Sequence, residues 1–427
     1  MIFFNISKCL ILSLLIKYNL YNDKIIKILL KNIYKCGVIP VKMIQWSLPY
    51  MKLLEVDKNI LDVFENTYEK CPLHDEEYTN KIYKQDFYIN IYEEYEIIDI
   101  IGSGSIAQVY KIKDIKSGKL FAMKVKHPDV LNNFNYIKYL LKIIFLFFSF
   151  NKIIPVKLNI FLDQFKKQLN FINEGNNLIK FYNLYENNNL FKIPELFKIS
   201  ENIIIMEYIK ADTIELLKDN NYKYSKFNLY ISLFLENNLN CYNFNHGDLH
   251  NYNWKIADGK VVIYDFGLCW EFNDPVSYET TLKSLDYLLE GFHNTDNQLI
   301  YKSFKTLIQV NSEISEDIMK EYFFNLPDIS RFVSFFKYVV EFSIKHNMTL
   351  NIELIYIIIS YQNILLIFMK NYDENSEFEH HSLHMEEYNL CDYYNIFPEY
   401  RQILLRRLGE YDKKETINYN KLNKFIH

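Results

Sequence analysis

The sequence predicts an α+β fold of two lobes, with an N-terminal helical extension and a largely helical C-terminal lobe. Apolar residues recur at three- and four-residue spacing through residues 1–90, which is typical of helices. From Glu96 the pattern changes to short β-like runs, and after Ala211 it is mainly helical again. With 427 residues the chain can bury a large core, so a small fold that depends on disulfides is excluded.

Three consecutive runs, EIIDII, AQVYKIKDI and LFAMKVK, predict a meander of strands, and the turn Lys116–Lys119 joins the last two. A long helical segment follows from about Asn132 to Leu184. Two further runs, LFKIPELFKI and NIIIMEYI, complete a five-stranded sheet with an inserted helix. A short hairpin over Trp254–Tyr264 turns at Asp258-Gly259.

We therefore divide the chain into four parts. They are the helical extension (1–90), an N-lobe with the sheet and inserted helices (91–210), a helical C-lobe (211–370), and an acidic linker with a helical tail (371–427).

The overall composition restricts partners and location. A net charge of −5 argues against nucleic acid as a partner, because binding it usually needs a basic stripe. The six cysteines show no C-x-x-C pair, which favours a reducing compartment. Lys8 interrupts the apolar residues 2–16 and no small-residue cleavage site follows, so a secretory signal is not expected. The runs 140–150 and 354–369 are shorter than the roughly 18 residues of a membrane span, so core helices are expected there. We expect an intracellular, cytoplasmic location, with a mitochondrial or membrane-associated one as the alternative.

The segment IGSGSIAQV, Ile101–Val109, lies between the first two predicted strands. Gly102 and Gly104 would let backbone N–H groups approach a polyphosphate closely, because no Cβ blocks the path and positive φ is available. A plain Gly-Ser hairpin turn is the alternative. We assign nucleotide binding to Gly102, Ser103, Gly104, Ser105 and Val109.

Lys124 lies on the third predicted strand, within FAMKV. A lysine there is costly to bury without an anionic partner, and Glu174 in the inserted helical segment is the best candidate. Such a pair would hold the ammonium group against the α- and β-phosphates of a nucleotide. The alternative is a lysine that snorkels to the surface.

The apolar run IIIMEYI, Ile203–Ile209, suits the connection between the lobes. Backbone groups of Glu207 and Ile209 would bind the edge of an adenine there. An ordinary buried strand explains the same residues equally well.

The strongest signal is HGDLHNYN, His246–Asn253, followed by VVIYDFG, which contains Asp265. The hairpin between them would bring Asp248, Asn253 and Asp265 together. Asn253 and Asp265 offer the oxygen ligands that Mg²⁺ requires, and Asp248 can orient or deprotonate an attacking hydroxyl or water. Solvated turn residues are the alternative.

Two groups of histidines have expected structural explanations. His246 and His250 flank Asp248, and we expect them to brace the loop through hydrogen bonds. His380, His381 and His384 lie in the acidic linker without recognisable metal-ligand spacing, so a solvated loop is expected there.

With these residues in place, the chain resembles the UbiB-like atypical kinase family, associated with ubiquinone biosynthesis, over roughly Gly37 to Phe272. SIAQVY resembles that family's nucleotide loop, and KVKHPDV resembles its third strand and the following turn. GVIPVKMIQW resembles its helical extension, in which a K-x-G-Q motif reaches into the active site. Lys42 and Gln45 match that regulatory motif, whereas Ile44 replaces its glycine.

The sequence also departs from the family. QLNFINEGNN resembles the helix that carries an E-x-D motif and then the glutamate that pairs with the strand-three lysine, but Gln168 and Asn170 replace both acids. In the family the extension's lysine is understood to engage those acids and to obstruct protein substrates. Because Lys42 lacks charged partners there, we expect the extension to be held less firmly and nucleotide handling to be more conventional. The glycines in the nucleotide loop, where the family usually has alanines, favour the same expectation.

The resemblance implies a two-lobed protein-kinase-like fold that binds ATP and Mg. It implies phosphoryl transfer or ATP hydrolysis, linked to isoprenoid lipid or quinone metabolism and to a lipid or membrane surface. The implied roles are Lys124 and Glu174 on the phosphates, Asp248 as catalytic aspartate, and Asn253 with Asp265 on Mg. The phosphate acceptor stays open.

Three other functions compete with this one. A choline- or aminoglycoside-type kinase has a similar catalytic loop but would lack Lys42, Gln45 and SIAQVY. A conventional Ser/Thr kinase suits the glycine loop, but HGD replaces H-R-D and no A-P-E-like segment follows Gly267. A pseudokinase scaffold would not need the lysine, glutamate, asparagine and aspartates that are all present.

Glycine itself is scarce. Seven of the ten glycines lie between Gly102 and Gly267, which we read as positions of close backbone approach or unusual φ. Gly175 is the exception, because nothing in the sequence accounts for a glycine inside that predicted helix.

Overall fold

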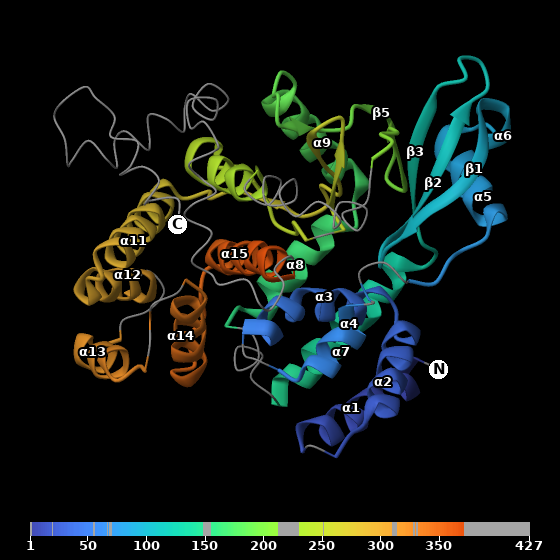
Figure 1. Ribbon diagram of the computed structural model, residues 1–427. Coiled ribbons are helices and arrows are strands. Elements are labelled where there is room, and N and C mark those ends of the chain that lie inside the picture. Colours follow the sequence, from blue (N-terminus) through green and yellow to red (C-terminus); the bar gives the residue numbers. More distant parts are fainter. Residues whose placement is uncertain are drawn as a thin grey trace, which may run out of the picture.

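The computed structural model describes residues 2–370, except 19, 54–55, 66, 68–70, 148–154, 212–229, 251, 310–313, 328 and 330–331. A sheet lobe stands at one side, a helical lobe at the other, and the N-terminal helices lie beneath them (Figure 1). The acidic linker, its histidines and the C-terminal tail fall outside the described residues.

The extension consists of helices, as expected. They are α1 (Ile2–Lys17), α2 (Asp23–Lys35), α3 (Val38–Leu53), α4 (Lys58–Glu65) and α5 (Glu76–Phe87). The α2–α3 break falls at Gly37, whose φ of +96° is strained for other residues. Apolar side chains from α2, α3 and α4 form a shared core, and α3 also contacts two helices further along the chain. The contacts with these two later helices place α3 next to the candidate active site described below.

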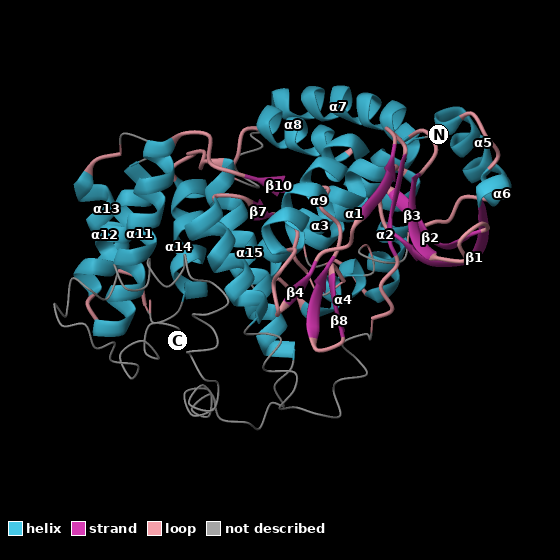
Figure 2. Cartoon of the chain, turned by 90° about the horizontal axis from the view of Figure 1, so that it is seen from above, coloured by secondary structure: helices cyan, strands magenta, loops and turns pink. Residues whose placement is uncertain are grey.

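The predicted five-stranded sheet is present, with antiparallel neighbours in the order β1-β2-β3-β6-β5. Figure 2 shows β1, β2 and β3 side by side. The short helix α6 (Ile91–Glu94) precedes the sheet. Its strands are β1 (Tyr95–Ser103), β2 (Ala107–Asp114), β3 (Leu120–Lys126), β5 (Leu196–Ile199) and β6 (Ile203–Glu207).

Two details differ from the sequence expectation. The long helical segment is three helices, α7 (Val130–Phe147), α8 (Leu158–Gln168) and α9 (Phe171–Tyr185). The run 190–199 divides between two sheets, because β4 (Phe191–Lys192) pairs in parallel with β9 (Lys260–Ile263) while β5 stays in the main sheet. The predicted hairpin is formed by β8 (Trp254–Ala257) and β9, with its turn at Asp258-Gly259.

The structure also explains Gly175. A Cβ at this position in α9 would lie 2.0 Å from Ile199 Cδ1, because β5 packs directly on the helix. The glycine therefore permits a close approach between helix and sheet, not a special turn.

The C-lobe is largely helical. Residues 230–237 are helical and continue into the π-helix η3 (Asn238–Tyr242), and β7 (Asn245–His246) pairs with β10 (Cys269–Trp270). The other helices are α11 (Pro275–Asn294), α12 (Asn297–Gln309), α13 (Glu316–Phe324), α14 (Phe332–Lys345) and α15 (Ile352–Lys370). Among the described residues, every helix is too short or too polar to cross a bilayer.

Gly291 sits where α11 meets α12, and its replacement by alanine is expected to destabilise the fold. The new Cβ would lie 2.6 Å from Ile300 Cγ1 and 2.9 Å from Ile300 N, and that backbone atom cannot move aside cheaply. We expect a loss of about 2 kcal/mol despite the better helix propensity of alanine, measured as a lower Tm by circular dichroism. Gly102→Ala is the matched control, because its Cβ would meet nothing within 4 Å; equal Tm values would contradict the prediction.

Candidate active site

Three chain segments meet at the ammonium group of Lys124 on β3. Its Nζ lies 2.7 Å from Glu174 Oε1 of α9 and 3.1 Å from Asp265 Oδ1, which follows β9. The lysine and glutamate side chains are 12% and 4% exposed, whereas Asp265 is 43% exposed. The lysine is therefore a buried, paired cation and not a snorkelling surface residue, as the sequence predicted.

The charges in this cluster shape its protonation. Burial disfavours the charged lysine, but Asp265 and Glu174 outweigh burial and raise the Lys124 pKa. Burial would also raise the pKa of Asp265, yet Lys124 and Lys42 hold it well below its usual range. For Glu174, burial prevails over the attraction of Lys124 and raises the pKa to about 7. Asp265 is thus the firmly ionised carboxylate, and it is the one most open to solvent.

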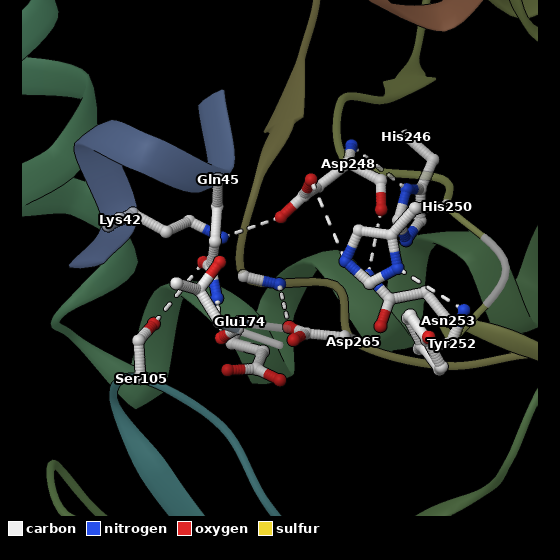
Figure 3. A network of polar contacts seen from close by, with 12 residues as sticks. Lys42, Gln45, Ser105, Glu174, His246, Asp248, His250, Tyr252, Asn253 and Asp265 are labelled. Atoms are coloured by element: carbon white, nitrogen blue, oxygen red, sulfur yellow. Dashed lines mark hydrogen bonds and ion pairs between the residues drawn. The ribbon is translucent and has the colours of Figure 1, made fainter. Parts of the chain in front are cut away.

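Lys42 of α3 reaches the catalytic loop. Its Nζ donates to Asp248 Oδ2 at 2.6 Å, and the two side chains are only 8% and 11% exposed (Figure 3). The expectation of a loosely held extension is therefore wrong, because Lys42 forms an ion pair with Asp248. Burial would raise the Asp248 pKa, but Lys42 and then His250 hold it below its usual range.

The loop 246–253 is braced internally. His246 Nε2 lies 3.1 Å from the Tyr264 carbonyl, and the Asp248 N–H points to His246 Nδ1 at 3.3 Å, so a neutral imidazole satisfies both contacts. Asn253 Nδ2 donates to the Asp248 carbonyl at 2.7 Å and contacts His250 Nε2 at 3.3 Å. The histidines brace the loop as expected, and the orientation of Asn253 leaves its carbonyl oxygen as the possible cation ligand.

The backbone conformation of the nucleotide loop differs from the one predicted for its glycines. Gly104 N–H donates to the Ala107 carbonyl at 2.9 Å, and Ser105 Oγ lies 3.4 Å from Gln45 Oε1 of α3. Ser103 is buried and its hydroxyl lies 3.4 Å from the Pro72 carbonyl. Gly102 and Gly104 do not use positive φ, so that part of the argument for glycine was wrong, although their Cβ positions are open. Val109 lies opposite Lys124 in the β2–β3 register.

The proposed adenine-binding segment lies at the end of β6. The Glu207 N–H donates to the Glu195 carbonyl at 2.8 Å, and its carboxylate pairs with Lys192 at 2.5 Å. Ile209 follows the strand and is half-buried. The backbone N–H of Glu207 is thus already used within the sheet lobe, while the role of this segment stays a prediction.

Two features of the site escaped sequence reasoning. Lys42 and Asp248 are 206 residues apart, and no spacing signals their contact. His127, within KVKHPDV, contacts the Gly104 carbonyl through Nε2 at 3.1 Å. For the second contact, the sequence offers only a histidine that directly follows the lysine strand.

Comparisons with known proteins identify the family. A family model described as the ABC1 atypical kinase-like domain matches residues 67–304, just over half of the chain. An uncharacterised aarF domain-containing protein kinase of Arabidopsis thaliana, described as chloroplastic, is 25% identical over 214 residues, which are 48% of this chain and 28% of that protein. The chain thus spans little more than a quarter of that relative's length.

A solved structure, the Rv3197–erythromycin complex from Mycobacterium tuberculosis, aligns with 78% of this chain and 88% of its own at 13% identity and a TM-score of 0.45. The family match extends from the end of the extension through the sheet lobe and the catalytic loop to α12. The chain therefore belongs to the ABC1 atypical kinase-like family, the UbiB-like atypical kinases that its motifs resemble.

Proposed function

We propose that this protein is an ATP-binding, magnesium-dependent phosphotransferase or ATPase of the UbiB-like type. The single observation that supports the proposal best is the buried cluster in which Lys124 pairs with both Glu174 and Asp265. A lysine fixed in this way presents its remaining positive charge to phosphate oxygens at a defined place, as kinases require.

The residues around the cluster suit a cation with oxygen ligands. Asp265 offers an ionised carboxylate that is 43% exposed, and Asn253 offers its carbonyl oxygen because its amide nitrogen is already bonded. When bound, Mg²⁺ would neutralise charge on the phosphates. Asn253 and Asp265 would hold it.

Asp248 is the group suited to accept a proton from the attacking hydroxyl or water. In the structure its Oδ2 accepts a hydrogen bond from Lys42, so that contact has to loosen before this oxygen can accept a proton. The 11% exposure of the Asp248 side chain favours a small acceptor or water over a folded protein substrate. The link to isoprenoid lipid or quinone metabolism, and to membrane surfaces, rests on the family resemblance.

The test measures magnesium-dependent ATP turnover by the purified protein. It is run with no additions, with phosphatidylcholine vesicles, and with vesicles that also contain phosphatidylserine. We expect turnover that requires Mg²⁺, is stimulated by vesicles and occurs without phosphorylation of a protein or peptide.

Each alternative has its own outcome in the same assay. Phosphorylation of a defined Ser/Thr peptide would favour a conventional kinase, and phosphorylation of choline or an aminoglycoside would favour a small-molecule kinase. ATP binding without any turnover would favour a pseudokinase scaffold. Absence of ATP binding would overturn the proposal.

A further inference from the structure

Two histidines outside the proposed catalytic machinery meet beside the nucleotide loop. His74 precedes α5, His127 follows β3, and their Nδ1 atoms lie 2.8 Å apart. His127 Nε2 lies 3.1 Å from the Gly104 carbonyl and 3.4 Å from Ser103 Oγ. Its backbone N–H also donates to the Ile106 carbonyl at 2.9 Å. His127 therefore holds the loop at two points, and His74 holds His127.

The contacts continue from His74 into the sheet lobe. His74 Nε2 lies 3.0 Å from Thr79 Oγ1, which lies 2.7 Å from the Tyr110 hydroxyl. Gln108 Nε2 donates to that hydroxyl at 2.6 Å, and Gln108 Oε1 accepts from the backbone N–H of His74 at 3.0 Å. Gln108, Tyr110 and Thr79 are fully buried. These buried, hydrogen-bonded side chains thus hold the His74–His127 pair in place.

In this series of hydrogen bonds, the groups at the two ends, the Gln108 amide and the Gly104 carbonyl, determine where the hydrogens lie. A carbonyl only accepts, so the hydrogen of a neutral His127 is on Nε2 and its Nδ1 is bare. His74 then carries its hydrogen on Nδ1 and accepts through Nε2 from Thr79, which accepts from Tyr110. Each hydrogen bond in the series is therefore donated in the same direction, starting at the Gln108 amide and ending at the Gly104 carbonyl.

Burial favours the neutral form that this arrangement needs. It is the main cause that lowers the pKa of His74, to about 4, and it lowers the pKa of His127 despite the Gly104 carbonyl, which raises it. Both imidazoles are then neutral at pH 7.

The nucleotide loop needs such support because its glycines allow the backbone many conformations. Gly102 and Gly104 lack a Cβ, so they restrict the backbone of the loop less than any other residue would. N–H groups that face phosphates bind well only if they are held in place before the ligand arrives. The loop has a further contact to the extension, in which Ser105 Oγ lies 3.4 Å from Gln45 Oε1.

We propose that His127 and His74 are positioning residues that hold the nucleotide loop in its binding conformation through the Gly104 carbonyl. This inference rests on the proposed function of the loop. Neither residue belongs to the cluster of Lys124, Glu174 and Asp265 or to the catalytic loop. Their effect is on the affinity for ATP rather than on the chemical step.

The test uses pairs of amide substitutions that keep one ring-nitrogen position each. Glutamine places its amide near the Nε2 position and asparagine near the Nδ1 position. His127→Gln keeps a donor for Gly104, whereas His127→Asn loses it. We expect His127→Asn to raise the KM for ATP about tenfold with kcat within about twofold, and His127→Gln to stay within about threefold of wild type.

For His74 the pattern should reverse, since its donor to His127 is Nδ1. His74→Asn should be tolerated and His74→Gln should raise the KM. His346→Asn, in the turn directly after α14, is the control and should leave both constants unchanged. Equal effects of asparagine and glutamine at either position, or a loss confined to kcat, would overturn the proposal.

A second readout does not depend on nucleotide. Amide hydrogen exchange of residues 101–109 in the nucleotide-free protein should accelerate in His127→Asn and not in His127→Gln, with circular dichroism confirming that both variants fold. Unchanged exchange in His127→Asn would overturn the positioning role. If wild-type protein binds no ATP but the exchange pattern appears, the proposed function fails and the positioning role of the pair stands.

Discussion

Replacing Asp265 with asparagine is expected to lower magnesium-dependent ATP turnover by at least about 100-fold. The substitution removes the ionised carboxylate that is most open to solvent in the cluster and leaves an amide of the same shape. Lys124 keeps its partner Glu174 at 2.7 Å, so the fold should survive. The positive φ of 58° at this position adds no strain, because asparagine tolerates it. Turnover is measured across a magnesium titration, in which the variant should need at least about ten times more magnesium.

The matched control is Asp258→Asn, which makes the same change in the exposed turn between β8 and β9. It also lies at positive φ, 50°, so the backbone demand is the same. Turnover in this control should equal that of wild type. If Asp265→Asn kept wild-type turnover and magnesium dependence, the metal assignment would be wrong.

Replacing Lys42 with glutamine is expected to raise ATP turnover about tenfold, because the reaction no longer has to displace a charge-assisted hydrogen bond from Asp248. Loss of the ammonium group should also raise the Asp248 pKa, since Lys42 is the main influence that lowers it. The acid limb of the pH–rate profile should therefore move to higher pH, which a kinetic titration between pH 4 and 8 would show.

Two further substitutions isolate this effect. Lys42→Arg keeps the charge and should stay near wild type. Lys52→Gln, on the same helix α3, breaks the 2.5 Å pair with Glu65 of α4 without touching Asp248. A fall in turnover in Lys42→Gln, as large as that of Asp265→Asn, would show instead that Lys42 takes part in the reaction.

Local patterns in the sequence predicted most of the architecture. Period-two runs predicted the strands of the main sheet, and Asp258-Gly259 predicted the hairpin turn, because strand alternation and turn chemistry depend on neighbouring residues. The division of residues 190–199 between two sheets was missed. A two-residue strand has almost no pattern of its own, and its parallel partner β9 lies about 70 residues away.

The sequence by itself selected the candidate site residues: Lys124, Glu174, Asp248, Asn253 and Asp265 were predicted from residue type and spacing. The tertiary structure decided how they are used. It paired Lys42 with Asp248 across 206 residues, reversing the expectation drawn from the missing acids at 168 and 170. It showed that Gly175 is required by the approach of β5, and it placed His74 and His127 beside the nucleotide loop. The physical reason is that a buried charge or imidazole must find a partner wherever the fold places one, and that choice depends on three-dimensional packing rather than on sequence neighbours.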